Sequence, residues 1–127
     1  MDKIVREWVE ISEYDLETAQ AVLKARRYLY VAFLCQQAVE KILKAIYVRK
    51  KKCLPPRTHN LLYLAEQLKL DISLKDLELF SLLTQFYFEN RYPGERVRLA
   101  REMNKNKAAE ILKDARRVYR CLREKLQ

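Results

Sequence analysis

The chain has 127 residues, about half of them apolar, with one Gly and three Pro. This length supports one hydrophobic core, so we expect a single domain over residues 1–127 and neither a disordered chain nor a turn-rich fold. The net charge is +9, no apolar run approaches the ~20 residues of a membrane span, and the three cysteines form no C-x-x-C pair, so we expect a reduced, cytoplasmic protein without a membrane segment.

The first predicted helix begins after Asp2, a natural N-cap, and fades between Lys24 and Arg27. Its inner face is predicted from residues that recur at steps of three and four: Ile4, Trp8, Ile11, Asp15, Ala19 and Val22.

A second predicted helix runs over about residues 29–51 and ends in three lysines, which a helix C-terminus favours. Its expected inner stripe consists of Ala32, Cys35, Val39, Ile42 and Ile46. Beside that stripe lies a polar ridge of Gln37, Glu40, Lys41 and Lys44, again at steps of three and four. Pro55 and Pro56 then enforce an extended loop.

Three further helices are predicted from capping residues and apolar periodicity. Thr58 is expected to cap a short third helix, Ser73 a fourth helix that runs to about Phe88, and Asn104 a long final helix. The path of residues 90–103 is left open, and the only Gly, in Tyr92 to Glu95, indicates a turn there. We therefore predict an all-α fold: two long antiparallel helices, two shorter ones and a long closing helix.

Asp15 breaks the apolar stripe of the first helix, and a buried carboxylate needs a cation or several donors. One interpretation is a structural polar tie, with Asp15 and Glu40 as its carboxylates and Lys41 or Lys44 as the cation, that fixes the register of two helices. The other is that the polar ridge, including Gln37 and Glu40, lines a ligand pocket. The sequence leaves both open.

His59 is the only histidine and is expected at the start of the third helix, beside Arg57. Free N–H groups at a helix start hold anions such as phosphate, although His59 could equally pack or bond locally. One histidine and dispersed cysteines form no metal ligand set, so no metal site is expected.

Arg91 and Tyr92 follow an aromatic stretch and open a basic region at the end of the chain. Arginine beside tyrosine is a reasonable phosphate or base contact. The alternative is that the aromatic residues cover core or dimer surface while Arg91 fixes the loop. Charge alternates along the chain: residues 1–23 and 58–90 are acidic, whereas 24–57 and 91–127 are basic. This pattern indicates a positive surface for an anionic ligand or complementarity between chains.

Taken together, these segments resemble the HEPN domain family of small helical prokaryotic proteins over roughly residues 5–125. The resemblance is carried by Trp8 with Asp15-Leu16, by the run YVAFLCQQAVEKILKA over residues 30–45, by RTHNL over 57–61 and by FYFENRYP over 86–93. It implies an up-and-down bundle of four or five helices, usually a homodimer. Some members look like nucleotide-binding partners of a minimal nucleotidyltransferase, whereas others are metal-independent RNases, often toxins.

The nuclease members carry an Arg followed four to six residues later by His. In their mechanism the imidazole of this His moves the proton of the ribose 2′-hydroxyl. Here Arg91 is followed at that spacing by Arg96 and Val97, and no His lies beyond His59. We therefore expect a non-catalytic homodimer that binds a nucleotide or phosphate through Gln37, Lys41, Lys44, Arg57, His59, Arg91 and Tyr92, with a nucleotidyltransferase partner and no other cofactor. The alternatives are an RNase toxin that acts on RNA and a purely structural interaction bundle.

Overall fold

The computed structural model describes residues 2–127, and residue 1 of the expected domain lies outside it. The described residues form helices and no strand. The helices are α1 (Lys3–Lys24), α2 (Tyr28–Lys51), α3 (Leu61–Gln67), α4 (Leu74–Glu89), α5 (Pro93–Glu102) and α6 (Lys105–Glu124). The predicted all-α bundle is thereby confirmed.

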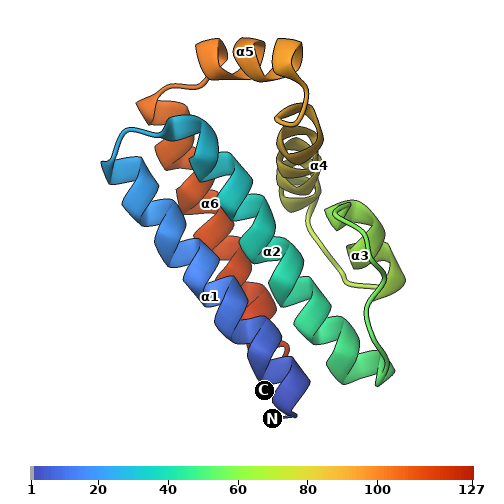
Figure 1. The fold of residues 1–127 in the computed structure, drawn as a ribbon. Coiled ribbons are helices and arrows are strands. Elements are labelled where there is room, and N and C mark those ends of the chain that lie inside the picture. Colours follow the sequence, from blue (N-terminus) through green and yellow to red (C-terminus); the bar gives the residue numbers. More distant parts are fainter. Residues whose placement is uncertain (1) are drawn as a thin grey trace.

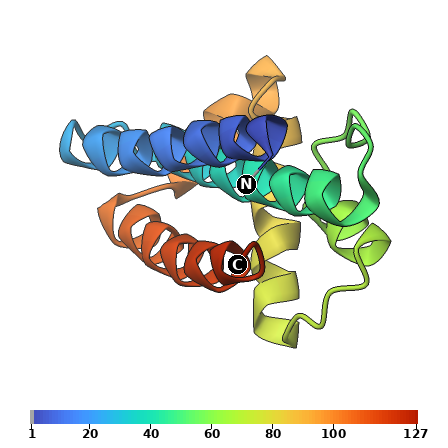
Figure 2. The same ribbon diagram turned by 90° about the horizontal axis from the view of Figure 1, so that it is seen from below.

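Helix α2 lies at the centre of the bundle, with α1 antiparallel to it and α6 packed along both (Figure 1). The chain begins and ends at the same end of these three helices (Figure 1). On its other side α2 contacts α3 and α4, while α5 lies across the far end (Figures 1 and 2). The functional residues of α2 are therefore held between two layers of helices.

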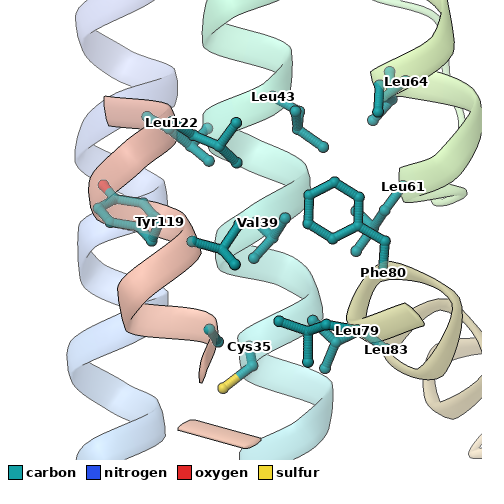
Figure 3. Close-up of a cluster of buried hydrophobic side chains, with 14 of the residues drawn as sticks. Cys35, Val39, Leu43, Leu61, Leu64, Leu79, Phe80, Leu83, Tyr119 and Leu122 are labelled. Carbon is teal, nitrogen blue, oxygen red and sulfur yellow. The ribbon is translucent and has the colours of Figure 1, made fainter. Parts of the chain in front are cut away.

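The core extends from the α1–α2–α6 layer to α4 without a break. Phe80 of α4 is fully buried and points between α2 and α3, near Val39 and Leu61 (Figure 3). The predicted inner stripe of α2 is buried throughout, and residues on its other faces, such as Val31 and Leu43, are buried as well. Helix α2 is buried on several sides because α1, α3, α4 and α6 all pack on it.

Helix α1 packs through a face rotated from the predicted one. Ile4 and Ile11 are 42% and 46% exposed, whereas Val5, Val9 and Ser12 are buried, so the prediction for the two isoleucines was wrong. Ser12 lies inside because its hydroxyl is satisfied: it donates to the carbonyl of Val9 and lies 2.7 Å from the hydroxyl of Tyr119 on α6. The buried face of α1 thus includes a hydroxyl that contacts α6.

The helix starts agree with the expected caps at Asp2, Ser73 and Asn104, whose side chains each accept a backbone N–H. The third start differs: Asn60 rather than Thr58 caps α3, because its side chain accepts the N–H of Tyr63. Residues 93–102 form a helix in place of the expected turn, since Pro93 occupies a first helical position that needs no N–H donor.

Candidate functional site

The site is built around Glu40, a carboxylate that is almost completely buried on α2. Its Oε1 accepts hydrogen bonds from Gln36 Nε2 at 3.0 Å and from His59 Nδ1 at 2.8 Å, and its Oε2 accepts one from Lys44 Nζ at 3.0 Å. Burial alone would raise the pKa of Glu40, but these three hydrogen bonds outweigh it and hold the pKa below its ordinary value. Glu40 is therefore an ionised acceptor at neutral pH.

His59 is oriented by that carboxylate. An ionised Glu40 accepts hydrogen bonds only, so Nδ1 of His59 carries a proton and Nε2 is the nitrogen left for a ligand. Gln36 also donates to the backbone carbonyl of His59 at 2.9 Å, which holds the loop to α2. The side chain of His59 is 41% exposed. Because Asn60 caps α3, His59 precedes the helix and does not form its anion-binding start as expected.

The lysines of the ridge are engaged inside the protein. Lys44 is only 7% exposed, is bonded to Glu40 and lies over the ring of Trp8 at 5.7 Å from its centroid. Lys41 donates to Gln37 at 2.6 Å and lies 3.9 Å from the carboxylate of Asp15. Both cations are thus occupied by neighbouring side chains.

Burial sets the electrostatics of the outer pair of this network. It raises the pKa of Asp15 above its ordinary value, against the attraction of Lys41, and it lowers the pKa of Lys41. The Nζ of Lys41 and the Oδ2 of Asp15 are 3.9 Å apart, and both side chains are partly accessible, at 16% and 19%. This long distance and partial exposure indicate a weak contact between α1 and α2.

An aromatic wall adjoins His59 on the side of α4. The ring of Tyr87 stacks on His59 at a centroid distance of 4.3 Å and on Phe33 at 5.6 Å. The guanidinium of Arg91 lies over the same tyrosine ring at 5.9 Å. The ring of Tyr87 therefore contacts both the imidazole of His59 and the exposed guanidinium of Arg91, which lies between α4 and α5.

Four polar residues flank His59 or the end of α4 along the chain: Arg57, Asn90, Arg91 and Tyr92. Arg57 and Arg91 are exposed and have no ion pair within residues 2–127. The side-chain oxygen of Asn90, beside Arg91, is buried without a hydrogen-bond partner among those residues. Tyr92 is 64% exposed at the start of α5. The two guanidinium groups and the hydroxyl of Tyr92 offer donors to a ligand, and Nε2 of His59 is an acceptor while the imidazole is neutral.

The structure places the residues predicted for the site in two groups. The inner group forms one hydrogen-bonded and ion-paired network on α1 and α2: Asp15, Gln37, Glu40, Lys41 and Lys44. His59 joins the inner group to the outer one, whose other members, Arg57, Arg91 and Tyr92, make no hydrogen bond or ion pair with the network within the described part of the chain.

The sequence reasoning missed Gln36 and Tyr87 as parts of the site. Gln36 is completely buried, yet it lies one helical turn before Glu40, and that spacing was a usable signal. Tyr87 belongs to the apolar pattern of α4 but is only partly buried, and its stacking on His59 depends on a contact between residues 28 positions apart. No local pattern reports such a contact.

The arrangement suits an anionic ligand. Its exposed edge offers two guanidinium groups, an oriented imidazole and aromatic faces, which together match phosphate and a flat base. No group of His, Cys, Asp or Glu side chains among residues 2–127 has the arrangement of a metal site. Over the same residues no helix is long and apolar enough to cross a bilayer.

Comparisons with known proteins agree with the helical fold. The chain is similar to the putative toxin MJ1304 of Methanocaldococcus jannaschii, at 28% identity over an alignment 140 residues long that covers 98% of this chain and 90% of that protein. Its fold matches TT1696 of Thermus thermophilus, with a TM-score of 0.80, 24% identity and coverage of 98% and 99% of the two chains. It also matches ST0689, an archaeal HEPN homologue, with a TM-score of 0.77, 23% identity and coverage of 99% and 100%. The model of the HEPN domain matches residues 5–125, nearly the whole chain, and this chain therefore belongs to the HEPN domain family.

Proposed function

We propose that the chain is a non-catalytic HEPN module that binds a nucleotide or another phosphate-bearing ligand, acting as a homodimer with a minimal nucleotidyltransferase partner. One observation supports ligand binding. The ring of His59 is held at the surface by Glu40 and Tyr87, and nearby arginines are exposed and have no ion pair among the described residues. Forked guanidinium donors are groups that phosphate recognition uses, and Nε2 of His59 donates to a phosphate oxygen when both ring nitrogens carry a proton.

Within this proposal, the predicted ligand contacts take different roles. Arg57, His59, Arg91 and Tyr92 contact the ligand, because their side chains are accessible. Three other residues hold the site in place rather than contact the ligand, because each already bonds to a neighbour within the network: Gln37, Lys41 and Lys44. The positioning depends on Glu40, which joins Lys44 and Gln36 to His59.

The homodimer is supported by apolar side chains that the monomer leaves uncovered beside the site. Phe88, Tyr92 and Val97 are 43%, 64% and 51% exposed around the junction of α4 and α5. A second copy that covered this junction would enclose the ligand site. Analytical ultracentrifugation should give a dimer, and a monomer at all concentrations would contradict this part of the proposal.

Cys35, Cys53 and Cys121 are free thiols, which is consistent with our placement of the protein in the reducing cytoplasm.

Isothermal titration with ATP, GTP and inorganic phosphate tests ligand binding. We expect Arg91→Ala and Arg57→Ala each to weaken binding about tenfold, since a lost charge-assisted hydrogen bond costs roughly 1.5–3 kcal/mol. Arg49→Ala is the matched control, because Arg49 is an exposed arginine at the distant end of α2. The absence of heat from wild-type protein at millimolar ligand would overturn the proposal.

The partner is tested by co-purification. We expect the tagged chain to retain the product of an adjacent gene when the two are expressed together, and that product to have a minimal nucleotidyltransferase sequence. Failure of the two to associate, with or without nucleotide, would remove the partner from the proposal and leave ligand binding to be judged by titration.

A second candidate function, an RNase toxin, is favoured by the Glu40–His59 pair. A neutral imidazole fixed by a carboxylate on Nδ1 presents Nε2 as a base, the orientation used in general base catalysis. Nε2 would take the proton of a ribose 2′-hydroxyl, whose oxygen attacks the adjacent phosphorus. The 5′-oxygen would leave with the proton returned by the imidazolium, giving a 2′,3′-cyclic phosphate. The similarity to a protein named as a putative toxin is consistent with this alternative.

Incubation with structured and single-stranded RNA separates the two functions. The non-catalytic proposal expects no cleavage by wild-type protein beyond that by His59→Ala. Cleavage that His59→Ala abolishes, with products ending in a 2′,3′-cyclic phosphate, would replace the proposed function by the RNase.

A further inference from the structure

A second cationic surface lies between α1 and α6, away from the residues of the candidate site. This α1–α6 groove has a volume of about 380 Å³ and is lined by Gln20, Leu23, Ala109, Leu112, Lys113, Arg116, Arg117 and Arg120. Four of these residues are basic and none is acidic. The helices that form it pack directly on one another, so the groove belongs to the rigid layer of the bundle (Figures 1 and 2).

Three of the four cations have no ion-pair partner among the described residues. Arg117 binds the carboxylate of Asp76 at 2.7 Å, but Lys113, Arg116 and Arg120 are exposed and form no ion pair within residues 2–127. They recur within two turns of α6, where like charges at spacings of three and four repel one another. No ion pair among the described residues therefore accounts for these three charges.

The adjacent turn of α6 shows how the chain pairs a cation when pairing serves the fold. Arg123 lies 3.4 Å from Glu13 of α1, so α1 provides a carboxylate there. Gln20 is the polar residue that α1 contributes to the groove. Glu13 and Glu17 of α1 share a neighbouring cavity with Arg116 and Arg120, but neither carboxylate forms an ion pair with these two arginines among the described residues.

The positive track continues beyond the groove. Leu23 lines the groove, and the chain then runs through Lys24 at the end of α1 and through Arg26 and Arg27 between α1 and α2. These three cations are exposed and have no ion pair among the described residues. Lys113 and Arg120 alone are separated by about 10 Å along the helix, at 1.5 Å per residue. The track is therefore longer than one phosphate group.

We propose that the α1–α6 groove binds the phosphodiester backbone of a single-stranded nucleic acid. A row of cations is sufficient for backbone binding, and the partly exposed Leu23 in the lining offers apolar contact to a sugar or base. An acidic protein would need an apolar pocket for an anchoring side chain, whereas the apolar residues of the lining are Leu23, Ala109 and the nearly inaccessible Leu112. Nucleic acid is thus the ligand class that this surface fits.

The test measures binding by fluorescence anisotropy with a labelled, 2′-O-methylated RNA of about 20 nucleotides, longer than the site of one small binding domain. The methyl groups block cleavage through the 2′-hydroxyl, so the result does not depend on the function of the His59 site. We compare wild type with Arg116→Glu/Arg120→Glu. The matched control is Lys3→Glu/Lys75→Glu, which changes the net charge equally at two exposed positions outside the groove.

We expect Arg116→Glu/Arg120→Glu to weaken binding at least tenfold at about 100 mM salt, and to reduce the slope of log Kd against log salt by about 1.4 for two lost phosphate contacts. The control should change the affinity less than threefold. Equal losses in both variants would assign the binding to net charge and overturn the proposal. Competition by poly-glutamate as effective as that by the unlabelled RNA at equal charge would overturn the assignment to nucleic acid.

Discussion

The Glu40 cluster, formed by Glu40 and its hydrogen-bond partners Gln36, Lys44 and His59, and the α1–α6 groove both contain basic side chains. The two regions differ in whether these side chains are paired within the protein. In the cluster Lys44 is bonded to Glu40 and nearly inaccessible, whereas in the groove Arg116 and Arg120 are exposed without an ion pair among the described residues. A buried cation without a partner would be very costly, and an exposed one costs little. The comparison indicates that cations in the cluster serve the structure and that those in the groove are available to a ligand.

The strongest way to break the cluster is to remove its central carboxylate. Glu40→Gln keeps the shape but leaves Lys44 buried without a counter-charge, so we expect the free energy of unfolding to fall by about 3–5 kcal/mol. Urea denaturation followed by circular dichroism measures the change. Glu66→Gln is the control, because Glu66 is exposed and has no ion pair within residues 2–127.

A double variant sharpens this result. Glu40→Gln/Lys44→Met removes both charges, and we expect it to recover much of the lost stability because an uncharged, well-packed pair avoids the desolvation penalty. A loss below about 1 kcal/mol for Glu40→Gln alone, within the range of an ordinary hydrogen bond, would show that Glu40 is not the electrostatic centre of the cluster.

The acid stability of the protein should reflect the same carboxylate. The pKa of Glu40 is lower in the folded state than in the unfolded chain, so its contribution is present above the unfolded pKa and is lost as the pH falls through the folded one. We expect the unfolding free energy of wild type to fall with acidification below the ordinary pKa of glutamate. Glu40→Gln should show a shallower fall in the same urea titrations, and an identical pH profile would contradict the assignment.

How far the sequence predicts this molecule depends on the range of the interactions. The caps at Asp2, Ser73 and Asn104 follow from local hydrogen bonds, and they were predicted correctly. The inner face of α1 was partly wrong because burial of Ser12 depends on Tyr119, more than one hundred residues away. Local periodicity carries no information about such a partner.

The candidate site shows the same division. Gln37, Glu40, Lys41 and Lys44 share a ridge that helical spacing predicts, and the structure places them in one network. Which of these charges is satisfied internally depends on His59 and Asp15, from a loop and another helix. Sequence spacing therefore identifies a polar group of residues but does not separate positioning residues from exposed contacts.

In the groove, charge reversal should stabilise the fold slightly. Arg116→Glu/Arg120→Glu replaces repulsion from Lys113 and Arg117 by attraction at helical spacing, but positions 116 and 120 still repel each other and Glu124 repels position 120, so we expect a gain of no more than about 0.5 kcal/mol at low salt. The gain should shrink in about 0.5 M salt, where screening acts over a few ångströms. Destabilisation in urea melts would show that these arginines support the fold and would weaken the contrast with the cluster.

The smallest change in stability is expected from substitution of Asp15. Burial raises the pKa of Asp15 despite Lys41, so its ionised form is disfavoured in the folded state relative to the unfolded chain. Its contribution is present at low pH and declines as the pH rises past the ordinary aspartate value, the opposite sign to that of Glu40. Asp15→Asn should therefore change the stability at pH 7 by less than about 0.5 kcal/mol, or increase it, because the lost contact with Lys41 is long and partly exposed. A loss above about 2 kcal/mol in urea denaturation, approaching that expected for Glu40→Gln, would place Asp15 inside the cluster as an essential tie between α1 and α2.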